Sequence, residues 1–170
     1  TRDNRETADF ISSTDVPVTL HAPYNVHGVN PCEEWTFQAP AWFGKGSFTD
    51  YAMAETLEAA DRLDAPLVVV HAGTFTTGNP DSAIERFSAF TDRWGDPRLV
   101  LENLPVTFRG ARMLGNTGAE LAVLTSGTQF GICLDFSHLY CSSVSLILPF
   151  EDMLSGFGHL PVKYHHLTKS

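Results

Sequence analysis

Short apolar runs alternate with helical patterns along almost the whole chain, and this alternation is what most constrains the fold. Strands are predicted at residues 16–21, 67–71, 98–102, 130–135 and 162–166. Helices are predicted at residues 6–13, 51–63, 81–94 and 118–125 and within residues 146–154. Strands that are apolar along most of their length and are joined by helices are typical of a parallel sheet buried on both faces.

Such an alternation builds either an open doubly wound sheet or a (β/α)8 barrel. None of the predicted strands is followed by a G-x-G-x-x-G or G-K-[ST] loop, the motifs that bind dinucleotides and nucleotide phosphates. A complete barrel typically has about 250 residues and carries its catalytic groups at the carboxyl ends of the strands. For 170 residues we therefore predict one domain, residues 1–170, that is an incomplete (β/α)8 TIM barrel truncated at both ends.

Composition narrows the possible functions. The chain carries 20 acidic and 11 basic residues, for a net charge of −9, which argues against nucleic-acid binding through a broad basic surface. It does not exclude a nucleic-acid enzyme whose positive charge comes from bound metal ions. No apolar run approaches the roughly 20 residues of a membrane span, and the three cysteines form no C-x-x-C motif. We expect a cytoplasmic protein with no membrane partner, and the sequence indicates no oligomeric state.

Every predicted strand ends in a residue type that binds metal ions. In chain order these residues are His21, His71, Glu102, Asp135 followed by His138, and His165 or His166. Because the carboxyl ends of barrel strands meet at one mouth, these side chains are predicted to converge there. Imidazole and carboxylate ligands suit zinc, manganese or iron. One histidine at a strand end is usually a structural residue, and Asp135 also fits a helix N-cap, but so many ligand types at consecutive strand ends favour a metal site.

These motifs resemble the endonuclease IV-like (AP endonuclease family 2) branch of the xylose-isomerase-like TIM barrels. The segments that carry the resemblance are His21-Ala-Pro-Tyr24, Val70-His-Ala-Gly73, Leu101-Glu-Asn103, Cys133-Leu-Asp-Phe-Ser-His138 and His166-Leu-Thr168. The resemblance covers nearly the whole chain and places it at about strands three to seven of eight. Leu-Glu-Asn and Asp-x-x-His are shared across the superfamily, whereas the first two segments point more toward the nucleases.

The resemblance implies a set of metal ligands around one carboxylate. His21 and His71 would bind one zinc ion, and Glu102, the expected catalytic residue, would bridge it to a second. Asp135 and His166 would bind that second ion. The implied reaction is hydrolysis of a phosphodiester at an abasic site in DNA, through attack by metal-bound hydroxide, with two or three zinc ions as cofactors and damaged DNA as the partner.

Three further residues complete the expected site. By the same resemblance, His138 would bind a third zinc ion, and Tyr24 would lie near the DNA at the abasic site. Arg109 stands in the loop after Glu102 and is a candidate phosphate contact. The resemblance places an Asp-x-His pair and a final Glu, which complete the family's ligand set, beyond residue 170.

The sequence also departs from the nuclease pattern and leaves a second function open. Asn25-Val26 stands where the nucleases usually have Asn-Leu, and Thr168-Lys-Ser170 stands where they have Asn-Asp-Ser. The alternative is a sugar or sugar-phosphate isomerase or epimerase that uses one Mn²⁺, Mg²⁺ or Co²⁺ ion, with His21 and His71 in supporting positions. Because an open barrel leaves strand edges unpaired and ligands missing, we expect the chain alone to be weakly active or inactive.

Overall fold

The computed structural model describes residues 2–14, 16–24, 28–32, 46–76 and 79–167. Its helices are α1 (Arg2–Ser12), α2 (Phe48–Arg62), α3 (Pro80–Arg93), α4 (Gly118–Leu124), α5 (Phe136–Leu146) and α6 (Phe150–Ser155). Its strands are β1 (Thr19–His21), β2 (Leu67–His71), β3 (Thr74–Phe75), β4 (Leu99–Glu102), β5 (Thr107–Phe108), β6 (Ala111–Met113), β7 (Gly131–Asp135) and β8 (Val162–His166). None of the helices in these ranges is long and apolar enough to cross a membrane.

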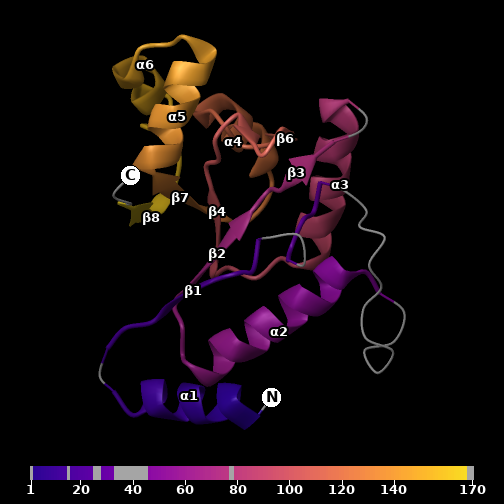
Figure 1. The fold of residues 1–170 in the computed structure, drawn as a ribbon, viewed down its shortest axis with the longest axis vertical. Helices are drawn as coiled ribbons and strands as arrows, with labels where there is room; N and C mark the ends of the chain where they lie inside the picture. The colour runs from indigo at the N-terminus through magenta and orange to yellow at the C-terminus, as the bar shows by residue number, and fades with distance from the viewer. Residues whose placement is uncertain (1, 15, 25–27, 33–45, 77–78, 168–170) are drawn as a thin grey trace.

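Five of the strands form one parallel sheet in the order β1-β2-β4-β7-β8. Within this sheet, the strands lie side by side in chain order, as in a (β/α)8 barrel, whereas a doubly wound sheet reverses its order at a switch point. The predicted α/β fold of the barrel type is therefore confirmed. Helices α5 and α6 lie together near β7 and β8, at the end of the sheet opposite to α1 and α2 (Figure 1).

Strand residues alternate between two apolar layers. In β2 and β4, the side chains of Val68, Val70 and Leu101 belong to the large core beneath the helices. Val69 and Val100 face the other way and form a small inner layer with Cys133, Leu67 and Tyr164. Because side chains two residues apart share a face, the last residues of the strands stand directly above this inner layer. The alternation thus places the predicted metal ligands on the inner face of the sheet.

Several predicted elements differ from the structure at their boundaries. Helix α1 begins at Arg2 rather than at residue 6, and α2 begins at Phe48 rather than at residue 51. The first strand begins at Thr19 rather than at residue 16, since Pro17 has no N–H with which to join a ladder. The helix predicted within residues 146–154 is correct only for α6, because a separate helix, α5, begins immediately after β7. Helix α5 ends at Leu146, because the next residue, Ile147, has a left-handed φ of 56° that stops the helix.

A second, three-stranded antiparallel sheet, in the order β3-β6-β5, was not predicted. Thr74 of β3 pairs with Met113 of β6, and β5 and β6 form a hairpin around Arg109 and Gly110. Both turn residues have positive φ, 50° and 83°, as the tight two-residue turns of hairpins require. The sheet is built from segments that directly follow β2 and β4, so it stands beside the mouth at which those strands end.

Candidate metal centre

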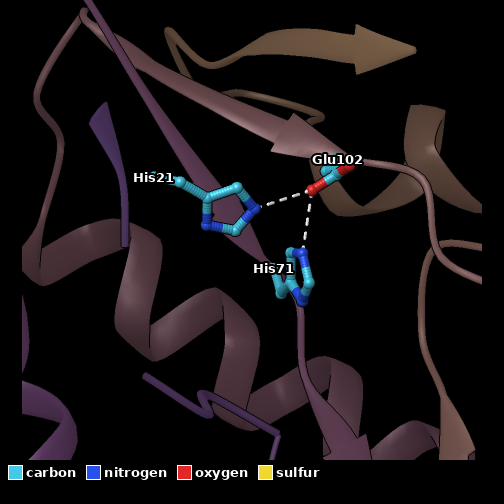
Figure 2. A group of neighbouring side chains, drawn as sticks. All are labelled: His21, His71 and Glu102. Atoms are coloured by element: carbon cyan, nitrogen blue, oxygen red, sulfur yellow. Dashed lines mark hydrogen bonds and ion pairs between the residues drawn. The ribbon is translucent and has the colours of Figure 1, made fainter. Parts of the chain in front are cut away.

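Glu102, the last residue of β4, is surrounded by imidazole rings. Its Oε2 atom lies 3.0 Å from Nε2 of His21 and 2.8 Å from Nε2 of His71, and Figure 2 shows both rings directed at that oxygen. Its Oε1 atom lies 2.7 Å from Nδ1 of His166. The side chain of Glu102 is only 2% exposed. The two oxygens of one buried carboxylate therefore face two separate groups of metal-ligand residues.

The ionisation of Glu102 is governed by these neighbours. Burial alone would raise the pKa of its carboxyl group. The hydrogen bonds with His21, His71 and His166 outweigh burial and hold the pKa well below its ordinary value. Glu102 is therefore a carboxylate, which only accepts hydrogen bonds or binds cations.

His21 is held in one orientation by the backbone. Its Nδ1 atom lies 2.7 Å from the carbonyl oxygen of Ala22, and because a carbonyl only accepts, Nδ1 carries a proton. A backbone carbonyl orients metal-binding histidines in proteins in this way and leaves the other nitrogen to the metal. Burial lowers the pKa of His21, but hydrogen bonds with Glu102 and Ala22 outweigh it, so the pKa is raised.

His71 is the more buried of the two, with a side chain only 8% exposed. Burial lowers its pKa more than the hydrogen bond with Glu102 raises it, so the neutral imidazole, which is the form that binds metals, is favoured. The Tyr24 ring centre lies 5.1 Å from that of His21 and 4.7 Å from that of His71. Tyr24 is half exposed and covers the two histidines on their open side.

Asp135 uses its two oxygens for different purposes. Oδ1 accepts the backbone N–H of His138 at 2.8 Å and caps α5. Oδ2 lies 3.9 Å from Nδ1 of His138 and 3.9 Å from Nδ1 of His166. The N-cap and metal-ligand interpretations of Asp135 are therefore compatible, because each involves a different oxygen.

His138 has one ring nitrogen that is hydrogen-bonded to the backbone and one that is left for a metal ion or a substrate. Its Nδ1 lies 2.9 Å from the carbonyl oxygen of Asn103 and therefore carries a proton. That atom is also 3.7 Å from Oε1 of Glu102. Since Nδ1 is engaged as a donor, Nε2 is the atom that His138 can offer to a metal ion or a substrate.

The structure separates the two adjacent histidines at the end of β8. His166 shares a face with Tyr164 and reaches Glu102, whereas the ring of His165 stacks on Phe136 with 6.0 Å between ring centres.

The structure does not bring Arg109 to the centre. Its guanidinium lies over the Phe108 ring, 5.3 Å from the ring centre. The departures at residues 25–26 and 168–170 lie outside the described residues.

A cavity of about 350 Å³ opens over the cluster. Its polar lining includes the histidines of the cluster, Glu102 and Asp135. Its apolar lining consists of Leu104, Pro105, Phe108 and Met113, which belong to the β5–β6 hairpin and the segment leading into it. Sequence reasoning missed this apolar lining, because its residues form no pattern until the small sheet assembles them.

Cys133 of β7 also lies beside the cluster, although the sequence analysis assigned it no role. Its Sγ atom belongs to a group with donor atoms of Glu102 and His166, all within 4.8 Å of one another. Burial raises the pKa of the Cys133 thiol, and the negative charges of Glu102 and Asp135 raise it further. Cys133 is therefore a neutral thiol beneath the cluster, whereas a cysteine binds metals as its thiolate.

The donor set fits a divalent metal ion. Donor atoms of His21, His71 and Glu102 lie within 4.8 Å of one another, and so do those of Glu102, Asp135 and His138. Two ligands bound to one zinc ion at about 2.1 Å are roughly 3.4 Å apart in a tetrahedral site, so small side-chain movements are sufficient. Two histidines and one carboxylate are the protein ligands of many catalytic zinc sites.

Comparison with known proteins agrees with this arrangement. Residues 1–167 match the model of the family described as "Xylose isomerase-like TIM barrel". The chain belongs to this family. The match extends over both the sheet and the cluster at its carboxyl edge, and it confirms the family resemblance and the barrel type.

The chain is similar to two endonucleases in sequence and to an epimerase-like protein in fold. "Probable endonuclease 4" of Trichlorobacter lovleyi is 26% identical over 118 residues, which cover 64% of this chain and 42% of that protein. The crystal structure of endonuclease IV from Thermus thermophilus superposes with a TM-score of 0.60 at 26% identity, over 100% of this chain and 60% of that one. A D-tagatose 3-epimerase-like protein superposes with a TM-score of 0.66 at 18% identity, over 99% of this chain and 62% of that one. The epimerase-like structure shows a shared fold alone, and the chain spans less than two thirds of each relative.

Proposed function

We propose that this chain carries the metal centre of a zinc-dependent phosphodiester hydrolase that acts at abasic sites in DNA. The observation that carries the proposal is that the two carboxylate oxygens of Glu102 face different groups of histidines. Oε2 faces His21 and His71, while Oε1 faces His166. Enzymes that hydrolyse phosphodiesters with two metal ions hold them about 3.5–4 Å apart, and a carboxylate with ligands on both oxygens is suited to that spacing.

Each residue of the centre has a distinct proposed part. His21, His71 and Glu102 would hold one zinc ion, and Glu102, Asp135 and His166 would hold a second. His138 would act through Nε2, toward a third ion or the substrate. Bound zinc supplies charge stabilisation at the phosphate and lowers the pKa of a water molecule. The identity of 26% with two endonucleases supports the choice of DNA as substrate.

The surrounding residues prepare the cluster for this chemistry. The Ala22 carbonyl fixes the ring of His21, so that its Nε2 atom is directed toward Glu102. Burial keeps His71 neutral and excludes water from its side of the cluster. Tyr24 covers both rings at the open side, where a planar part of a nucleotide could stack against it.

A second candidate function is favoured by the cavity. A small cavity lined by apolar residues and a few convergent polar groups is typical of small-molecule sites. The net charge of −9 also repels DNA. Such a site suits a sugar or sugar phosphate, isomerised or epimerised with one Mn²⁺, Mg²⁺ or Co²⁺ ion held by Glu102, Asp135 and His166. His138 would then contact the substrate, and His21 and His71 would support Glu102.

The two functions are separated by one pair of assays. The metal-free chain is loaded with Zn²⁺ and mixed, in molar excess, with an end-labelled duplex that contains a single tetrahydrofuran abasic-site analogue. We expect slow, zinc-dependent cleavage at the lesion, absent from an undamaged duplex and absent with Glu102→Gln. Excess chain makes even weak activity visible as a single turnover.

The matching assay offers ketohexoses and their phosphates to the same chain loaded with Mn²⁺. Conversion of a sugar, together with an intact abasic duplex, would replace the hydrolase by the isomerase or epimerase. His165→Ala serves as the control variant in both assays, because that ring lies on the opposite face of β8, against Phe136.

A further inference from the structure

Asn103 joins the end of β4 to the end of β7 through its side chain. It is completely buried. Its Oδ1 atom accepts the backbone N–H of Asp135 at 2.6 Å, and its Nδ2 atom donates to the carbonyl oxygen of Asp135 at 2.9 Å. One side-chain amide therefore bonds both backbone groups of a single residue, as a neighbouring strand would.

This contact replaces a missing part of the sheet. The residue pairing between β4 and β7 ends at Glu102 and Cys133, two residues before Asp135. On that side, the backbone of Asp135 is held by the Asn103 side chain instead. The other side of Asp135 pairs with His166 of β8. Asn103 therefore fixes the position of Asp135 along β7 relative to Glu102 at the end of β4.

The backbone of Asn103 holds a second member of the cluster. Its carbonyl oxygen accepts Nδ1–H of His138 at 2.9 Å. Asn103 thus contacts both Asp135 and His138 and follows Glu102 directly in the chain. We propose that Asn103 is a positioning residue that aligns Asp135 and His138 with Oε1 of Glu102. This inference rests on the proposed metal centre and makes it more specific.

The chain offers a matched control in Asn30. The Oδ1 atom of Asn30 accepts the N–H of Thr74 at 2.9 Å, and Nδ2 donates to the carbonyl oxygen of Thr74 at 3.0 Å. Asn30 is also buried, at 4% exposure. Its partner starts β3 and belongs to none of the metal-ligand groups in the described residues. Asn30→Ala removes the same kind of hydrogen-bond pair to one backbone residue as Asn103→Ala, together with a contact of 3.3 Å from Nδ2 to the Thr74 hydroxyl.

The experiment titrates Zn²⁺ into the metal-free chain and follows heat by calorimetry and the histidine ring nitrogens by ¹⁵N NMR. The NMR spectra identify which histidines each zinc ion reaches. In Asn103→Ala we expect the zinc affinity of the group formed by Glu102, Asp135 and His166 to fall about 10–100-fold. This is the usual effect of losing an outer hydrogen bond of a metal site. Binding at His21 and His71 should be unchanged, and Asn30→Ala should bind as the wild type does.

Three outcomes would overturn the inference. Asn103→Ala could bind zinc as the wild type does at both groups, or Asn103→Ala and Asn30→Ala could weaken both groups equally, which indicates a general loss of structure. In both cases the proposed centre survives and only the role of Asn103 fails. If zinc reaches only His21 and His71 in the wild type, the two-metal centre itself fails, and this inference fails with it.

Asn103→Asp keeps the experiment decisive if Asn103→Ala does not fold. The variant has the same shape and still accepts the N–H of Asp135, but it cannot donate to the carbonyl oxygen of Asp135 while ionised. We expect a loss of affinity at the His166 group that is smaller than for Asn103→Ala. A folded Asn103→Asp chain that keeps full affinity there, while the ¹³C chemical shift of the introduced carboxyl group shows that it is ionised, contradicts the proposal.

Discussion

Glu102 and Asp50 are two carboxylates with lowered pKa values, yet their partners differ in kind. Burial opposes ionisation in both. In Glu102 it is outweighed by imidazoles, and in Asp50 by hydrogen bonds from Arg93 and Ser47. A guanidinium cannot give up its proton to bind a metal, whereas an imidazole can. A lowered pKa alone therefore does not identify a functional site, and the chemistry of the partner decides.

The two carboxylates also differ in what they connect. Asp50 lies in the first turn of α2, where it completes a capping box with Ser47 and accepts Arg93 of α3 at 2.6 Å. Its network joins two helices on the outside of the sheet. Glu102 joins the ends of separate strands on the inner face, where a cavity opens. The Asp50 network is typical of contacts that stabilise a fold, whereas the position of Glu102 at a cavity is suited to binding a metal ion or a substrate.

The largest expected difference follows from removing each charge. Glu102→Gln keeps the shape of the side chain but removes the charge that faces both histidine groups. We expect zinc affinity to fall by more than about 100-fold, beyond the loss typical of an outer hydrogen bond, and hydrolysis to disappear. Asp50→Asn should leave zinc affinity unchanged. Calorimetric zinc titration of both variants checks this, and equal behaviour would remove the distinction between the two carboxylates.

His21 and His71 provide the next test, because they distinguish the two candidate functions. In a zinc hydrolase, His21→Ala and His71→Ala should each lower zinc affinity at least tenfold and abolish most cleavage. In an isomerase or epimerase, both variants should keep much of their activity, while Glu102→Gln loses it. The readouts are cleavage of the abasic duplex and conversion of a sugar, with His165→Ala as the unaffected control.

The strand ends could be predicted from the sequence because they depend on local patterns. Apolar runs such as Val68 to Val70 identify buried strands, and the residue that follows each run stands at the carboxyl edge. Alternation along a strand also explains why His166 and not His165 reaches Glu102. His166 lies two residues after Tyr164 and therefore shares its face of β8, which belongs to the inner layer. Local pattern and parallel topology together were sufficient to predict that these candidate ligands lie close together.

Other features depend on contacts that no local pattern records. Strands β3 and β5 have only two residues each, too few to show alternation. Both pair with β6, and the β3–β6 pairing brings Thr74 to Met113 across a long stretch of chain. Helix α5 follows β7 with no intervening turn and contains four serines or cysteines in its second half, residues with modest helix propensity. The role inferred for Asn103 depends on where the β4–β7 pairing ends.

Thermal stability should respond to zinc through Glu102 and not through Asp50. A ligand present at 100 times its dissociation constant stabilises a protein by about 2.7 kcal/mol, which for a chain of this size is a rise of roughly 5–10 °C in Tm. We expect this rise in the wild type and in Asp50→Asn, and its reversal by a chelator. Calorimetric melts of Glu102→Gln should show almost no rise. A full rise in that variant would place the stabilising zinc elsewhere.

The smallest expected effect belongs to Asp50 and depends on pH. Its pKa is lower in the folded chain than in the unfolded chain, so ionised Asp50 contributes stability above the unfolded value of about 3.9. That contribution is lost as the pH falls through the lower, folded value. At pH 7 we expect Asp50→Asn to reduce the free energy of unfolding by about 0.5–1 kcal/mol, as for a lost cap, with the difference from the wild type shrinking below about pH 4. Urea unfolding from pH 7 to pH 3 measures it, with Glu55→Gln, an exposed carboxylate of the same helix, as control. If the difference in the free energy of unfolding between Asp50→Asn and the wild type stays constant from pH 7 to pH 3, Asp50 acts through packing and not through its charge. The contrast between the two carboxylates would then rest on the zinc binding of Glu102 alone.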